Sequence, residues 1–203
     1  MNQTTERSVE ALFPLPLHFA VHNDADQLNK KITKASYALK EKTPNTLPPG
    51  SSNDHYSTLW SGIGLLDQPG FEELRHFIAF EANVFANLLN FDIQNYPLKL
   101  TDSWLNIHGP ENSQEPYVHQ NNFISGVYYV KKPKDSGDLI IHSPYKYQML
   151  QAPITKVNQY TVRTIPITSE AGVLVLFQSF TEHSVQANKS NDDRISISFN
   201  FTM

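Results

Sequence analysis

The chain has 203 residues, of which 39% are hydrophobic and 18% charged, as is typical of one globular domain rather than a disordered segment. Its net charge of −4 and pI near 6.0 disfavour nucleic acid as a partner, and the lack of cysteine excludes disulfides, thiolate metal sites and cysteine nucleophiles. Polar residues at the start and the lack of a long apolar run predict a cytoplasmic protein that does not enter a membrane.

The first half of the sequence predicts two helices. The apolar segment 12–21 is interrupted by prolines and is expected to form an edge strand, where proline is tolerated. Asp24 or Asp26 can cap a helix that runs to about Lys42, because an apolar face follows at helical spacing. A proline-rich loop comes next, and a second helix is expected after Pro69-Gly70.

From about residue 98 the apolar pattern changes to a period of two, which indicates strands. Short antiparallel strands at this spacing predict a mainly β fold, a sandwich or a jelly-roll barrel, with both helices packed on one outer face. We therefore expect a single domain, 1–203, with a helical support region, 1–97, and a β core, 98–203. The expected strands are 98–107, 124–130, 138–142, 159–166, 173–178, 183–186 and 194–202.

Polar and apolar residues alternate along the last expected strand, so each kind occupies one face. A guanidinium group is always charged and binds a carboxylate through two hydrogen bonds. Arg194, with Ser196 on the same face, is thus a candidate carboxylate-binding position, whereas a strand facing water is the alternative. The polar residues of this strand are Arg194, Ser196, Ser198 and Asn200, and the apolar ones are Ile195, Ile197, Phe199 and Phe201.

Two of the eight histidines are candidates for chemistry. His119 leads into a strand and His183 follows one, and residues far apart in sequence can face each other across a barrel. Two imidazoles so placed can bind a divalent metal such as Fe(II) or zinc, although two unrelated strand histidines are an equal alternative. The histidines expected only to pack, to cap or to lie exposed are His18, His22, His55 and His76.

Five short motifs follow one another in the second half: Trp104-Leu105-Asn106, His119 to Tyr129, Pro133 to Leu139, Gly172 to His183, and Arg194 to Asn200. In this order they resemble the Fe(II)- and 2-oxoglutarate-dependent oxygenases, and in particular a group of small bacterial and phage proteins. The resemblance covers about residues 55–203. It implies a double-stranded β-helix (cupin-like) core, Fe(II) and 2-oxoglutarate as cofactors, and hydroxylation of a small molecule or of a protein side chain.

The resemblance also implies roles for individual residues. His183 matches the distal metal ligand and His119 the proximal metal region. Arg194 and Ser196 match the position that binds the far carboxylate of 2-oxoglutarate. The polar residues implied to project into the same cavity are Asn106 and Asn200, and those expected around the metal site are Tyr117, Ser125 and Tyr128.

The proximal motif departs from the family. The superfamily commonly uses His-x-Asp, whereas Asn121 stands at the acidic position after His119. Relatives in the group often carry His-x-His, with which Tyr117-Val118-His119 aligns. Three outcomes stay open: His119 and His183 bind iron with water completing the shell, Asn121 or an acid such as Asp138 contributes, or the metal has been lost.

The missing carboxylate also leaves other functions open. The main alternative is a non-catalytic jelly-roll protein that binds a small acid or a sugar without a redox metal. A third is a cupin-type isomerase or dioxygenase, which needs three or four clustered metal ligands. The loops 44–52 and 150–159 are the candidate lids, and a homodimer is compatible with the sequence.

Overall fold

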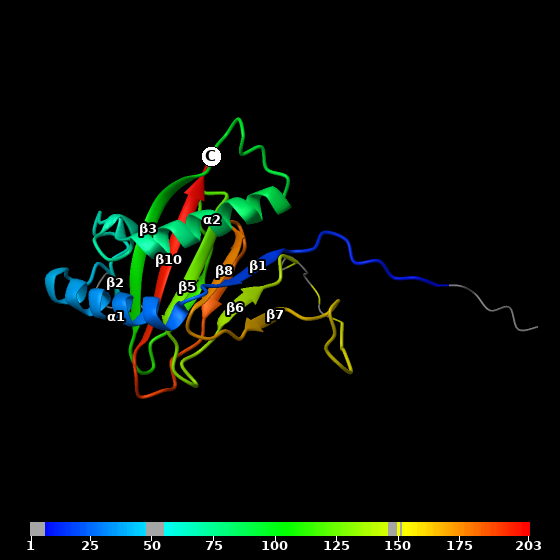
Figure 1. The fold of residues 1–203 in the computed structure, drawn as a ribbon. Helices are drawn as coiled ribbons and strands as arrows, with labels where there is room; N and C mark the ends of the chain where they lie inside the picture. The colour runs from blue at the N-terminus through cyan, green and yellow to red at the C-terminus, as the bar shows by residue number, and fades with distance from the viewer. Residues whose placement is uncertain (1–6, 48–54, 146–149, 151) are drawn as a thin grey trace, which may run out of the picture.

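The computed structural model describes residues 7–47, 55–145, 150 and 152–203. Figure 1 shows two helices lying over a curved sheet, with further strands behind it. Within the described ranges, no helix has the length and the apolar character that would let it cross a membrane. The helices are α1 (Ala25–Lys42) and α2 (Glu72–Leu88), with a 3₁₀ turn, η1 (Leu65–Asp67), before α2. The strands are β1 (Leu17–Val21), β2 (Tyr56–Ser57), β3 (Lys99–His108), β4 (Gln114–Tyr117), β5 (Ile124–Lys131), β6 (Leu139–His142), β7 (Thr164–Ile167), β8 (Val173–Gln178), β9 (His183–Val185) and β10 (Arg194–Thr202).

The strands form two antiparallel sheets. Six of them lie in the order β1-β8-β5-β10-β3-β2, and four in the order β4-β9-β6-β7. Side chains from both sheets meet in a small apolar cluster that contains Tyr129, Leu139 and Phe177. The expected mainly β architecture with helices on one face is confirmed, because both helices cover the six-stranded sheet.

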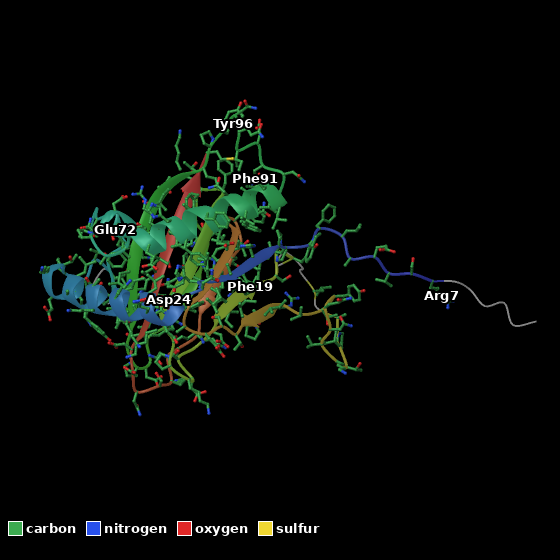
Figure 2. The ribbon with its side chains drawn as sticks, in the orientation of Figure 1. Arg7, Phe19, Asp24, Glu72, Phe91 and Tyr96 are labelled. Carbon is green, nitrogen blue, oxygen red and sulfur yellow. The ribbon has the colours of Figure 1, made fainter. Side chains whose placement is uncertain are left out.

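The first strand lies at an edge of the larger sheet, as expected for a segment preceded by prolines. β1 pairs only with β8, in the register Phe19 to Val175. Phe19 is 50% exposed, which accords with the edge position (Figure 2). The support region of the chain therefore contributes two strands, β1 and β2, to the sheet as well as the helices that cover it.

The final strand, β10, lies in the middle of the larger sheet between β3 and β5. Its alternation separates two environments. Ile197 and Phe199 are fully buried in the core that includes Leu28 of α1 and Leu74 of α2. This core also contains Ile195 and Phe201, so every apolar residue of the alternation faces the helices.

Both helices bury one stripe of small and apolar residues against the sheet. In α1 the stripe contains Leu28, Ile32 and Ser36, at the expected spacing. Asp24 occupies the position before α1 (Figure 2), but its side chain makes no capping hydrogen bond within this described segment. The predicted cap of α1 is therefore correct in position and wrong in mechanism. Instead, the backbone N–H of Asp24 donates to Nδ1 of His22 at 3.2 Å.

Four strands differ from the expected ones, and the first of them, β1, begins at Leu17 rather than near residue 12. β2 and β4 were not expected, because β2 has two residues and β4 (Gln-Glu-Pro-Tyr) lacks an apolar alternation. The strand expected at 159–166 begins only at Thr164. Before it, the Asn158 side chain accepts a hydrogen bond from the backbone N–H of Tyr160 at 2.9 Å, which forms a local turn in place of strand pairing.

Candidate active site

A cavity of about 360 Å³ lies between the two sheets. Its wall has an apolar part, which includes Trp104, Val127 and Phe177, and a polar part built from β3, β4, β9 and β10. An enclosed apolar pocket with a few convergent polar groups is the usual setting for a small-molecule site. The residues of the wall with polar side-chain groups, its tryptophans apart, are His55, Ser57, Asn106, His108, Gln114, Tyr117, His119, Tyr129, His183, Arg194, Ser196 and Ser198.

The structure brings His119 and His183 together in this cavity. Their rings are nearly parallel, at 19°, with centroids 5.1 Å apart. Nδ1 of His183 lies 2.8 Å from the carbonyl oxygen of Thr181, so this nitrogen carries the proton and donates it. The bond fixes the ring and leaves Nε2 of His183 as the nitrogen able to bind a metal.

Both histidines are neutral at pH 7. Burial, and then the neighbouring His183, lowers the pKa of His119 to about 3. Burial lowers the pKa of His183 to about 4, although the hydrogen bond to Thr181 acts in the opposite direction. Neutral imidazole is the form that binds metals, so the pair needs no deprotonation before it can act as two ligands.

Tyr117 packs against both histidines. It pairs with His183 across the β4–β9 ladder, and its ring centroid lies 4.3 Å from that of His183 and 5.1 Å from that of His119. The backbone N–H of His119 donates to the carbonyl of Ser179 at 3.0 Å, which holds the segment after β4 against the end of β8. Burial raises the pKa of the Tyr117 phenol well above its usual value, and nearby Arg194 opposes that shift.

Arg194 is a buried cation without a carboxylate partner. Its residue is 2% exposed, and one terminal nitrogen donates long hydrogen bonds to the carbonyls of Ser136 (3.5 Å) and Gly137 (3.4 Å). Nε has no partner in the described part of the chain, and no described carboxylate forms an ion pair with the group. Because an uncompensated buried charge is costly, this guanidinium favours the binding of an anion.

Gly137 has a specific part in placing this arginine. Its φ of +82° lies in the left-handed region, and a Cβ atom there would collide with the backbone carbonyls of Gln186 and Ala187. Only glycine therefore lets the turn before β6 pass close to the end of β9 and present its carbonyl to Arg194.

Two further histidines form a stack next to Arg194. His108 pairs with Arg194 across the β3–β10 ladder, and its ring lies parallel to that of His55, with centroids 4.0 Å apart. Neither ring nitrogen of His108 has a hydrogen-bond partner among the described residues. Burial, and then the charge of Arg194, holds the pKa of His108 well below its usual value, so this ring is neutral.

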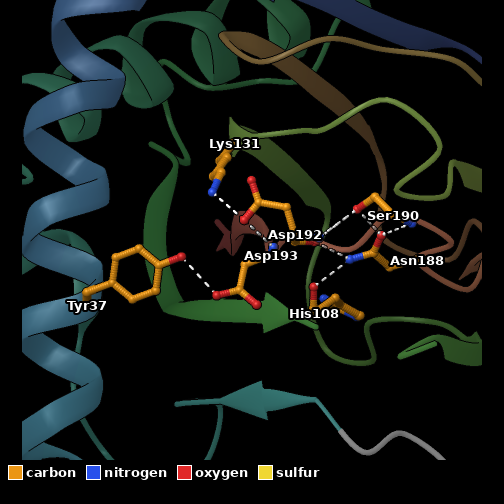
Figure 3. A network of polar contacts seen from close by, with 7 residues as sticks. All are labelled: Tyr37, His108, Lys131, Asn188, Ser190, Asp192 and Asp193. Atoms are coloured by element: carbon orange, nitrogen blue, oxygen red, sulfur yellow. Dashed lines mark hydrogen bonds and ion pairs between the residues drawn. The ribbon is translucent and has the colours of Figure 1, made fainter. Parts of the chain in front are cut away.

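A polar network outside the cavity fixes the start of β10 (Figure 3). The buried Asn188 amide donates to the carbonyls of His108 at 2.9 Å and Asp192 at 2.8 Å, and so joins the end of β3 to the loop before β10. The Tyr37 hydroxyl of α1 donates to Asp193 at 2.8 Å. Burial and the Asp193 carboxylate raise the pKa of Tyr37 to about 12, so it remains a donor.

The structure places several predicted residues in the cavity. Ser196 lines it beside Arg194, and Asn106 lines it from β3, where its amide donates to Ser198 at 3.2 Å. His55, which we expected only to pack, also lines the cavity, because the chain before β2 returns to β3.

Four predicted residues do not line the cavity. Asn121 is exposed in a turn with a φ of 63°, a conformation that asparagine tolerates. Ser125 and Asn200 bond each other at 2.8 Å away from the cavity wall. Tyr128 faces the helices, where its hydroxyl donates to Asn29 at 2.9 Å, because its neighbour Tyr129 takes the cavity face of β5.

The acidic alternative and the lids are also placed. The Asp138 carboxylate accepts hydrogen bonds from Lys132 at 2.9 Å and Thr168 at 3.1 Å and does not line the cavity. Residues 48–52 of the first candidate lid lie outside the described residues, whereas Leu47 lines the cavity. The second candidate lid, 150–159, borders a different pocket beside β6 and β7, and its residue 151 is not described.

The cavity residues to which sequence reasoning gave no role include Trp104, His108 and Tyr129. The period of two could have found the first two, because both lie two positions from Asn106. Among the described residues, no group of three or more His, Cys, Asp or Glu side chains is placed to hold a metal ion. The cavity therefore offers a metal two neutral imidazoles, those of His119 and His183, and no carboxylate among the described residues, and the cupin-type alternative lacks the cluster that it needs.

Comparisons with known proteins agree with this geometry. A family model described as "Putative 2OG-Fe(II) oxygenase" matches residues 102–200, and no curated protein sequence matches the chain. Among solved structures, a Pseudomonas putida prolyl-4-hydroxylase is similar, with a TM-score of 0.61 and 15% identity over 93% of this chain and 92% of its own. The α-ketoglutarate-dependent carbocyclase SnoK from nogalamycin biosynthesis gives a TM-score of 0.66 with 13% identity, over 92% of this chain and 79% of its own. A viral collagen prolyl hydroxylase from Paramecium Bursaria Chlorella virus-1 gives a TM-score of 0.57 with 12% identity, over 91% of this chain and 94% of its own. These likenesses show the jelly-roll fold.

Proposed function

We propose that this protein is an Fe(II)- and 2-oxoglutarate-dependent oxygenase that hydroxylates a substrate still to be identified, because a family model described as "Putative 2OG-Fe(II) oxygenase" matches residues 102–200. His119 and His183 are the proposed metal ligands, and Arg194 with Ser196 the proposed site of the far carboxylate of 2-oxoglutarate. The observation that supports this assignment best is the buried, unpaired guanidinium of Arg194 in the same cavity as two neutral imidazoles.

Several residues of the cavity then have defined tasks. Arg194 and Ser196 donate hydrogen bonds to the far carboxylate and fix the orientation of the oxo acid. The bond from His183 to Thr181 holds that imidazole for coordination. When bound, Fe(II) supplies oxygen activation coupled to the oxidative decarboxylation of 2-oxoglutarate. Apolar walls such as Trp104 and Phe177 exclude water from the reacting groups.

The rim of the cavity supports a proposal for the substrate class. Leu47, Leu59 and Trp60 line the cavity, and Trp60 is 63% exposed. An apolar rim favours a substrate that presents an apolar group to the site. A prolyl-4-hydroxylase and a carbocyclase are among the similar structures, so we propose a protein side chain or an apolar small molecule as the substrate.

The test uses Arg194→Met. Loss of the charge should weaken 2-oxoglutarate binding by about 10- to 100-fold, the usual value of hydrogen bonds to a charged group. Succinate formation with Fe(II) should fall with it. Removal of an unpaired buried charge should not lower the free energy of unfolding, so the loss cannot be ascribed to misfolding. Isothermal titration calorimetry and a succinate assay provide the measurements.

Arg75→Met is the matched control, because Arg75 lies on α2 in an exposed ion pair with Asp67 at 2.7 Å. It should leave both the affinity and the turnover unchanged. If Arg194→Met binds 2-oxoglutarate as tightly as the parent protein, the assignment of the carboxylate-binding position is wrong.

A second candidate function is a non-catalytic binder of a small acid. It is favoured by the lack of a carboxylate among the described metal donors. In that case the purified protein should bind 2-oxoglutarate through Arg194 but should take up no Fe(II), Co(II) or Ni(II) at micromolar concentration. Metal analysis after dialysis distinguishes the two candidates, since stoichiometric uptake that depends on His119 supports the oxygenase.

A further inference from the structure

A third aromatic ring completes the group around the proposed metal ligands. Tyr117 lies within 5.1 Å of His119 and 4.3 Å of His183, measured between ring centroids, and the two histidines are 5.1 Å apart. The three rings therefore contact one another pairwise, and all three line the same cavity. No other tyrosine of the cavity wall has a ring contact with either histidine in the described part of the chain.

The pairing of β4 with β9 brings this group together. Tyr117 lies directly opposite His183 in the β4–β9 ladder, so the two side chains share a face of the smaller sheet. His119 lies two residues after Tyr117 and follows the same face. The three donors thus come from one strand pair and the two residues beyond it.

The hydroxyl of Tyr117 is available for binding. It makes no hydrogen bond with another residue in the described part of the chain, although a buried tyrosine hydroxyl normally has a partner. A metal held by His119 and His183 would have only neutral protein ligands, because the other two ligands considered, Asn121 and Asp138, do not line the cavity. An anionic oxygen donor is what this site lacks.

We propose that Tyr117 is the third protein ligand of the metal, with its phenolate oxygen in the place that a carboxylate takes in most members of the superfamily. The inference rests on the proposed function, since it assumes a metal on His119 and His183. Binding forms one metal–oxygen bond and breaks the phenol O–H bond, and the proton leaves to solvent through the open side of the cavity. No oxidant or reductant is needed for this step.

A phenolate bound to Fe(III) has a signature that neither histidine nor water produces, namely a ligand-to-metal charge-transfer band in the visible region. The Fe(III) complex of the parent protein, prepared without 2-oxoglutarate, should show this band. Tyr117→Phe should abolish it and should weaken Co(II) binding by at least about tenfold, because the loss of a direct ligand costs no less than the loss of a group that only orients one.

Two variants make the result specific. Tyr129→Phe is the matched control, because Tyr129 is a buried tyrosine of the same cavity that has no ring contact with His119 or His183 among those described. It should keep both the band and the Co(II) affinity. Tyr117→His should keep Co(II) binding but lose the visible band, since imidazole can bind the metal without the phenolate transition.

Failure of the inference is distinguishable from failure of the proposed function. If His119→Ala abolishes Co(II) binding while Tyr117→Phe leaves the affinity unchanged and the parent complex has no visible band, the metal site stands and Tyr117 is not a ligand. If the parent protein binds neither Co(II) nor Fe(III), the proposed function fails, and the inference fails with it.

Discussion

The two faces of the six-stranded sheet differ in what their side chains do. On β10, Ile197 and Phe199 face the helices in an apolar core, whereas Arg194, Ser196 and Ser198 face the cavity. Stability and binding are thus assigned to alternate residues of a single strand. This separation means that changes on one face should affect unfolding and changes on the other should affect ligands, which the following predictions test.

The largest effect is expected on the helix face, from Phe199→Ala. Phe199 is fully buried, and truncation of such a side chain costs about 3 to 5 kcal/mol in the free energy of unfolding. The folded variant should bind 2-oxoglutarate as the parent does. Urea unfolding measures the loss of stability, and calorimetry measures the affinity for 2-oxoglutarate. Phe19→Ala, at a half-exposed edge position, should lower the free energy of unfolding far less. A change of 2-oxoglutarate affinity in Phe199→Ala would show that the two faces of β10 do not act separately.

On the cavity face, the neutral histidines make the metal-free protein sensitive to acid. The pKa of His183 is about 4 in the folded state, against 6.5 as the ordinary value, so the unfolded state binds more protons between these values. Stability should therefore fall as the pH is lowered from about 7 to 4, by at most about 3 kcal/mol for His183. His119 acts in the same direction.

Unfolding by urea at several pH values, with a chelator present, measures this slope. His183→Gln removes one titrating group and should flatten the curve between pH 6.5 and 4. An equally steep curve in that variant would show that other groups cause the acid sensitivity.

The smallest effect is expected at Tyr128, where the neighbouring tyrosines of β5 lie on opposite faces. Tyr128→Phe removes the hydrogen bond to Asn29 and should lower the free energy of unfolding by about 1 kcal/mol, with no effect on 2-oxoglutarate or metal binding. Tyr96→Phe, at an exposed tyrosine, provides the baseline. Altered ligand binding in Tyr128→Phe would mean that side chains on the helix face also affect the affinity of the cavity for its ligands.

Regular elements were predictable from the sequence because their patterns are local. The alternation of β10 identified both the strand and its polar face, and the spacing of Leu28 and Ile32 identified α1. β4 could not be found in this way, because Pro116 and Glu115 interrupt any apolar pattern and its pairing with β9 is decided by tertiary contacts.

The site was predictable only in part. The positions of Arg194 and Ser196 in the cavity follow from strand parity, whereas the contact between His55 and His108 joins segments more than fifty residues apart and has no local signal. The family motif contains both Tyr128 and Tyr129, and only the parity of β5 decides that Tyr129 faces the cavity, because one residue of register reverses every side chain of a strand. Asn121 was expected beside the metal from the family motif, but the left-handed turn places it at the surface.

The central position of β10 has a kinetic consequence. Its residues contact partners far away in the sequence: Ser198 bonds Asn106 across 92 positions, and Asn200 bonds Ser125 across 75. Such contacts require large loops to close before the core is formed, and chains dominated by them fold in milliseconds to seconds. Until β10 inserts, β3 and β5 both have an unpaired edge that can recruit another chain. The strand that carries the proposed carboxylate-binding residues is therefore also the one whose slow arrival leaves the folding chain most prone to aggregation.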